Sequence, residues 1–282
     1  MELELKKECL DTYELGEPQT LTQEETAETI VPDYCPDIAR IISAEGVVCL
    51  HGGTEQDGVT GTVRVTVLYT PENESGVRAL EFAMPFSAQG EGLAGCAHVV
   101  VETEIELLES RMLNPRKIFT RCKLVTHLAG CRKVCLTISS DAETDPALLV
   151  EKRCCGQTVS LLRQVAEKDL TFSETMSLSL GREGAAELLH CRANGIVTET
   201  KAIGNKLIFK GVFLVSALYR TIGGQLASAS AELPFSQIME TDSTEENTQV
   251  SMRLRITGTD IQIDGSDDEG RQLSVTVYYH TM

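Results

Sequence analysis

The chain of 282 residues contains no tryptophan, and aromatic residues make up only 5% of it. Surfaces that bind sugars or single-stranded nucleic acids use aromatic rings as stacking platforms. An excess of basic residues is also missing, because 25 Lys and Arg face 42 Asp and Glu, a net charge of −17. Binding to phosphate backbones or anionic membranes needs clustered Lys and Arg. The composition therefore argues against a partner that is a carbohydrate, a nucleic acid or a membrane surface.

Long hydrophobic runs are absent as well. No stretch approaches the ~20 apolar residues that a membrane-spanning helix needs, and residues 1–8 lack the apolar core of a signal peptide. We expect a cytoplasmic protein without direct membrane insertion. In that compartment most of the 10 cysteines are expected to be reduced thiols that pack in the interior, such as Cys49 and Cys122 in strand-like runs.

Sequence motifs for catalysis and metal binding are also lacking. No serine lies in a nucleophile-elbow motif, no glycine pair ends in the Gly-Lys-Ser/Thr of a P-loop, and no Cys-x2-Cys pair is present. The acidic run at 264–270 lacks the spacing of an EF-hand loop and predicts a hairpin turn. We expect no enzymatic activity, no cofactor and no bound metal.

One alternative is a small-ligand or zinc-binding β protein with its site near Cys131 and Cys135. Together with His127, these cysteines are spaced four residues apart, and adjacent Cys154 and Cys155 offer a fourth ligand. The competing interpretation is that Cys131 and Cys135 pack within a strand. An enzyme of unknown class is a further alternative, which would need a deep pocket with perturbed carboxylates or histidines.

What the sequence does contain is an internal repeat. Residues 61–69 and 211–219 both start at glycine, alternate in hydrophobicity and end on Leu-Tyr, at an offset of 150 (211 − 61). Pro-Phe follows in both copies, as Pro85-Phe86 and Pro234-Phe235, and residues 44–48 resemble residues 193–197 upstream. Matches in the same order at a nearly constant offset indicate one duplicated unit.

Period-two alternation predicts strands at 99–107 and 250–256, and closing strands at 118–128 and 273–279. A turn is expected at Asn114-Pro115. For the Pro-Phe pairs, we favour a buried phenylalanine where proline ends a strand over an aromatic ring presented to a partner.

Helix is expected only in short pieces. Residues 33–42, with Pro36 in the first turn, predict a capped short helix, and its counterpart is expected at 184–191.

Together these patterns predict a mostly β protein of two tandem antiparallel β-sandwich or barrel-like units, each with one short helix. We place the first unit at 1–140, a linker at 141–156 and the second unit at 157–282.

An acidic stripe is the candidate partner-binding feature. Glu102, Glu104 and Glu106 alternate with apolar residues, so they share one face of a strand. The stripe is interpreted either as a solvated face or as a surface that steers basic partners.

The order of these motifs resembles the SPOCS domain, the spore-coat-associated domain of endospore-forming bacteria. The first unit carries Glu-Thr-Ile-Val-Pro-Asp at 28–33, then Pro36-Asp37-Ile38, Gly46-Val47-Val48, the 61–69 strand and Pro85-Phe86. The second unit repeats the pattern with Gly195, the 211–219 strand and Pro234-Phe235. The two copies together cover nearly the whole chain.

The resemblance implies a non-enzymatic role in spore-coat assembly, as in the SipL-like and SpoVID-like coat morphogenetic proteins. It implies that the protein acts in the mother-cell cytoplasm, is recruited to the forespore surface and binds coat morphogenetic proteins, with the basement-layer ATPase as a candidate partner.

The sequence departs from the longer family members in two ways. We expect no LysM module, because no LysM-like segment follows the last strand. The second unit has Gly-Arg-Glu-Gly at 181–184 in place of the Pro-Asp-x-x-Pro-Asp motif, which weakens the expectation that both copies bind alike.

Overall fold

The computed structural model describes residues 4–51, 58–143, 153, 156, 158–178, 183–242, 248–264 and 271–282. All regular secondary structure in these residues is β, which confirms the expected mostly β class. The strands are β1 (Glu4–Leu15), β2 (Gln19–Ile30), β3 (Ile38–Leu50), β4 (Gly58–Pro71), β5 (Arg78–Gln89), β6 (His98–Asn114), β7 (Lys117–Glu143), β8 (Lys168–Ser177), β9 (Ala185–Ile203), β10 (Lys206–Thr221), β11 (Leu226–Glu240), β12 (Leu254–Ile263) and β13 (Gln272–Thr281).

Strands β1 to β7, which we call the first unit, form two antiparallel sheets. One has the order β3-β4-β5. In the other, β7 is central: β2 pairs with its first half, β6 pairs along its opposite edge, and β1 pairs with its second half. The buried faces of both sheets contribute to one hydrophobic cluster that includes Val63, Tyr69, Leu124 and Leu128.

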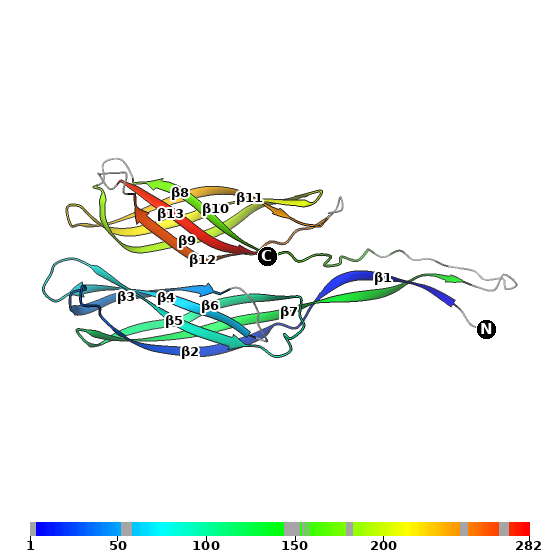
Figure 1. Ribbon diagram of the computed structural model, residues 1–282, viewed down its shortest axis with the longest axis horizontal. Coiled ribbons are helices and arrows are strands. Elements are labelled where there is room, and N and C mark those ends of the chain that lie inside the picture. The colour runs from blue at the N-terminus through cyan, green and yellow to red at the C-terminus, as the bar shows by residue number, and fades with distance from the viewer. Residues whose placement is uncertain are drawn as a thin grey trace.

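Strands β8 to β13, the second unit, repeat this arrangement. Their sheets have the orders β9-β10-β11 and β12-β13-β8. They enclose a separate cluster centred on Phe209, Phe213, Tyr219 and Tyr279. In Figure 1 the two units lie one above the other, and β1 runs with the far end of β7 away from both.

The repeat extends to single residues in the sheets. Gly61 and Gly211 lie where a side chain would collide with Phe86 and Phe235, respectively: an added Cβ would come within 2.5 Å of Phe86 Cζ and 2.6 Å of Phe235 Cζ. The glycine and the phenylalanine of each repeat are therefore a packed pair, and Pro85 and Pro234 are exposed next to it. The phenylalanines are buried as predicted. The prolines lie inside edge strands β5 and β11 rather than at strand ends, where a missing N–H is tolerated.

The predicted helices are wrong. The segments at 33–42 and 184–191 contain the first residues of β3 and β9 instead. The start of each strand carries two β-bulges three residues apart, at equivalent positions of the repeat. Ala39 and Ile42 have no partner residue in β4, and Ala186 and Leu189 have none in β10. Two bulges at this spacing turn the period of two into a period near three, which resembles the pattern of a helix.

The turn at Asn114-Pro115 is confirmed, since β6 ends at Asn114 and β7 begins at Lys117. The acidic turn at 264–270 lies outside the described residues except for Asp264, as does most of the linker placed at 141–156. The strand expected over 118–128 is much longer than predicted, because β7 continues to Glu143 alongside β1.

Candidate functional site

The predicted acidic stripe lies on the outer face of β6. Glu102, Glu104 and Glu106 are all exposed, while the residues between them point inward or are half-buried. Glu106 pairs with Lys123 of β7, with 2.9 Å between Oε2 and Nζ. The other two carboxylates lie opposite His127 and Val125, and neither makes an ion pair with any described residue. Glu102 and Glu104 are the part of the stripe that is open to a partner.

Opposite charges alternate across the rest of this face. Lys117 pairs with Glu28, and Arg121 Nη2 lies 2.6 Å from Glu24 Oε2, so β7 supplies the cations and β2 the carboxylates. Arg111 of β6 stacks over the ring of Phe119 at 4.9 Å. Exposed pairs of this kind contribute little to stability, so the face is charged and solvated with an acidic margin at β6.

A second feature is the loop at 31–37, which carries the Pro-Asp-x-x-Pro-Asp motif. The guanidinium of Arg116, in the turn between β6 and β7, holds this loop. Its Nη1 donates to Cys35 O (2.7 Å) and Asp37 Oδ1 (3.0 Å). Its Nη2 donates to Val31 O (2.9 Å) and Asp33 Oδ1 (3.1 Å). One arginine thus satisfies two carbonyls and both motif carboxylates.

The loop is also fixed from the sheet side. Tyr69 Oη donates to Pro36 O at 3.2 Å, and burial of this phenol raises the pKa of Tyr69 to about 12, so it stays a donor at neutral pH. At the tip, Tyr34 is 88% exposed. A rigid loop that presents a tyrosine to solvent resembles the aromatic anchors found at protein interfaces.

Arg271 occupies the position of Arg116 in the second unit. Leu178 N donates to Arg271 O just as Val31 N donates to Arg116 O. The 181–184 segment that replaces the motif there lies outside the described residues up to Arg182. Sequence reasoning missed Arg116, because it lies about 80 residues from the motif that it holds. The sequence signal that pointed to such a residue was the pair of motif aspartates, Asp33 and Asp37, whose carboxylates need a cation nearby.

The two units meet through polar contacts. His98 Nδ1 of β6 lies 2.9 Å from Glu167 Oε1, just before β8. Glu45 of β3 lies 2.9 Å from His190 Nε2 of β9, in ion-pair range but outside hydrogen-bond geometry. Arg255 Nη1 of β12 donates to Val101 O of β6 at 3.2 Å.

Arg255 is half-buried at this junction. Burial lowers the pKa of Arg255, while Asp169 and Glu167 oppose that shift. Its guanidinium thus lies between the units, with acidic residues of its own unit nearby and one carbonyl of the other unit as acceptor. The junction is polar and charged, unlike the two apolar cores.

The proposed zinc ligands do not converge. His127 is exposed and contacts Thr20, Cys131 is buried, and Cys135 forms a disulfide with Cys9 of β1. Cys154 and Cys155 lie outside the described residues. Within the described ranges, no group of three or more His, Cys, Asp or Glu side chains is arranged to hold a metal ion. Six other described cysteines are free thiols, as expected of a mostly reduced set.

Cys49 and Cys122 are buried as expected, and Cys191 is half-buried. Burial and the neighbouring Glu25 raise the pKa of Cys122 to about 11. Burial, together with Glu81 of the first unit and Asp260, raises the pKa of Cys191 to about 12. Thiols of this kind are protonated at neutral pH and are poor nucleophiles.

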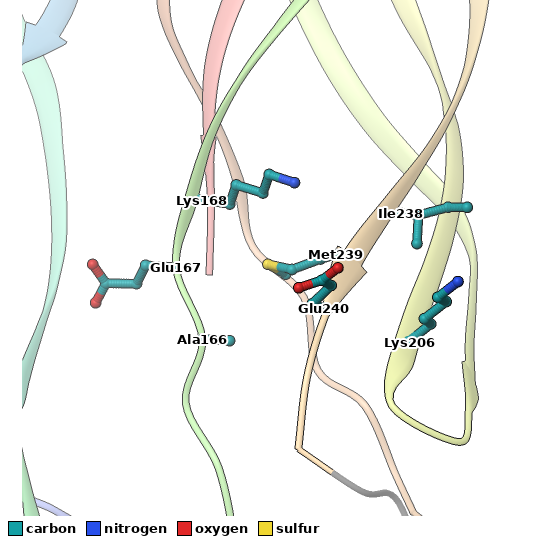
Figure 2. A pocket seen from close by; sticks show the side chains of 7 residues that line it. All are labelled: Ala166, Glu167, Lys168, Lys206, Ile238, Met239 and Glu240. Carbon is teal, nitrogen blue, oxygen red and sulfur yellow. The ribbon is translucent and has the colours of Figure 1, made fainter.

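A hollow of about 480 Å³ lies beside the start of β8. Its lining residues are Ala166, Glu167, Lys168, Lys206, Ile238, Met239 and Glu240. Figure 2 shows Glu167 pointing away from the other side chains, toward the first unit, where it contacts His98. The remaining lining is two lysines, one glutamate and aliphatic side chains, without a nucleophile beside a base.

Residues 185–264 match the family model of the SipL SPOCS domain. The matched segment begins with β9, continues through β10 and β11 and ends after β12, so it includes Gly195, Gly211 and the Pro234-Phe235 pair. It supports the resemblance drawn from the sequence and indicates a sporulation-related protein. Searches of curated proteins and of solved structures found no match.

No helix in the described part of the chain is long and apolar enough to cross a membrane.

Proposed function

We propose that this chain is a non-enzymatic assembly protein of the spore envelope, built from two SPOCS units and acting through protein–protein binding at the forespore surface. The observation that carries the proposal is the match of residues 185–264 to the SipL SPOCS domain. The first unit repeats the strand order, the paired bulges and the glycine–phenylalanine contact of that segment. This repetition supports extending the assignment to both halves.

In this proposal each unit is a β-sandwich. Its two sheets, of three and four strands in the first unit and of three each in the second, bury one face each in a common cluster, and their edges meet where β3 adjoins β6 and β9 adjoins β12. Such a module offers stable outer faces and loops for binding and has no need of a catalytic pocket.

On the first unit, we propose that the open carboxylates Glu102 and Glu104 form the partner surface. They bind basic groups of a coat morphogenetic protein. Exposed charges of this kind increase the rate of encounter and select the partner. The proposed site of action is the mother-cell cytoplasm, from which the protein is recruited to the forespore.

The test is affinity purification of the full chain from sporulating and from vegetative cells of its endospore-forming host. The proposal predicts coat morphogenetic proteins, the basement-layer ATPase among them, only in the sporulating sample. Glu102→Lys combined with Glu104→Lys should reduce that capture severalfold, whereas Glu232→Lys, an exposed position on β11, should not. Equal recovery from both cell types, or of no coat protein at all, would count against the proposal.

A further inference from the structure

Strand β1 and the second half of β7 form a two-stranded ribbon that projects from the first unit (Figure 1). On one face, Leu10 of β1 lies opposite Leu136 of β7, with Val134 and Ile138 on either side of Leu136. Leu136 is 42% and Ile138 38% exposed. A two-stranded ribbon with an exposed apolar face is marginally stable in water without further packing. Neither hydrophobic cluster of the described residues includes the side chains of this apolar face.

The backbone of this ribbon shows which edge is open. Tyr13 N donates to Leu162 O, so the polar groups of Tyr13 point away from β7. In an antiparallel pair, the backbone N–H and C=O groups of the residue opposite Tyr13 then also point away from the partner strand. The direction of these backbone groups alternates from one residue to the next along each strand. Tyr13 faces Lys133, so Lys133, Cys135, Thr137 and Ser139 direct their N–H and C=O groups outward. Cys131 O, which accepts from Ala97 N, fits the same alternation.

This edge differs from the edges of β5, β11 and β1. Edge strands β5 and β11 contain Pro85 and Pro234, and the edge of β1 is contacted by Leu162. Strand β6 covers β7 only as far as Cys131. Beyond it, no described strand pairs with the outer edge of β7, and residues 132–143 contain no proline. Proteins normally protect such edges from pairing.

We propose that the outer edge of β7 pairs with the same edge of a second copy of this chain. The two ribbons then form one four-stranded antiparallel sheet across a two-fold axis at Thr137. Thr137 is an outward-pointing residue, so it exchanges both backbone hydrogen bonds with Thr137 of the second copy. Cys135 does the same with Ser139 of the second copy.

The side chains favour a second copy over an unrelated strand. In this register Leu136 lies beside Ile138 of the second copy, and the reverse, so the two apolar faces become continuous. Ser140 is passed over in the pairing with β1, so the regular alternation of β7 ends at Ser139 and the self-complementary segment is 135–139. Cross-strand apolar pairs stabilise a sheet. The strand is thus complementary to itself in the antiparallel direction.

The test is the mass of the full chain by sedimentation equilibrium from about 1 to 100 μM. We expect a species of twice 30.8 kDa. Thr137→Pro removes the central outward N–H without removing a bond to β1, and we expect dimerisation to weaken at least ~10-fold. Thr137→Ala keeps the N–H and is the matched control. A chain that is monomeric throughout, or a Thr137→Pro dimer as tight as the wild type, would overturn the proposal.

If a variant fails to fold, hydrogen exchange of the wild-type chain tests whether the outer edge of β7 forms the interface. The amides of Cys135, Thr137 and Ser139 should be protected at concentrations where the dimer forms and exchange rapidly at concentrations where it does not. Rapid exchange in the dimer would place the interface elsewhere. Because these measurements use purified protein, their failure is distinct from failure of the spore-envelope proposal.

Discussion

At the scale of the residue, the clearest arrangement is one arginine that organises a distant loop. Arg116 joins the turn between β6 and β7 to the 31–37 loop through two carbonyls and two carboxylates. These bonds fix the backbone that presents Tyr34. The conformation of the loop that carries the motif is therefore held by a residue outside the motif.

Arg116→Ala should destabilise the chain by about 2 kcal/mol, because hydrogen bonds that involve charged groups contribute about 1.5–3 kcal/mol. The measurement is urea unfolding followed by circular dichroism. Arg121→Ala, which removes only an exposed pair with Glu24, is the control and should leave the urea midpoint nearly unchanged. Equal effects of the two substitutions would contradict the special role of Arg116.

The thiols make a second residue-scale prediction. A pKa raised to about 11 leaves roughly one molecule in a thousand of Cys122 as thiolate at pH 8, and the side chain is fully buried. Cys122 and Cys191 should therefore resist iodoacetamide in the native protein at pH 8 and react in urea. Peptide mapping by mass spectrometry measures this, with half-buried Cys96 as the comparison. Rapid native labelling of Cys122 would show that the core around it is open.

Residue-scale prediction from the sequence succeeded where alternation decides exposure. The exposed positions of Glu102, Glu104 and Glu106 follow from a period of two and were foreseen. The ion pair of Glu106 with Lys123 depends on which strand lies beside β6, and the role of Arg116 depends on the whole topology. Neither is encoded in local spacing.

At the scale of the element, the sequence predicted the strands whose alternation is uninterrupted, such as β4 and β10. It mistook the starts of β3 and β9 for helices, because two bulges three residues apart imitate helical spacing. It also stopped β7 too early. The second half of β7 is exposed on both faces, so its pairing with β1 leaves no strong hydrophobic pattern.

The glycine–phenylalanine pairs yield a prediction about β4 and β10. An alanine at Gly211 would bring its Cβ against Phe235 and the carbonyl oxygen of Ile196, and we expect Gly211→Ala to cost about 2–3 kcal/mol. Gly156→Ala, at a position with no neighbour within 4 Å, is the control. Thermal unfolding is the measurement. An unchanged Tm for Gly211→Ala would mean that this contact does not limit the packing.

At the scale of the whole molecule, two separate apolar cores meet across a polar junction. Contacts such as His98–Glu167 and Arg255–Val101 resemble those between domains that associate weakly. The sequence predicted the duplication, because the repeat offset is nearly constant. It carried no signal for the junction, whose partners lie on different units.

Two cores should unfold as two units. Calorimetry of the full chain is expected to resolve two transitions, and Gly61→Ala and Gly211→Ala should each lower the Tm of a different one. A single transition that both substitutions shift equally would indicate that the polar junction couples the units into one cooperative body.

The central claim, that the chain assembles at the spore envelope, is tested most directly by imaging a fluorescent fusion of the full chain through sporulation in its own host. The account predicts a cap or ring of fluorescence around the forespore after engulfment begins. Signal that stays diffuse in the cytoplasm throughout sporulation, or that is already localised in vegetative cells, would contradict it.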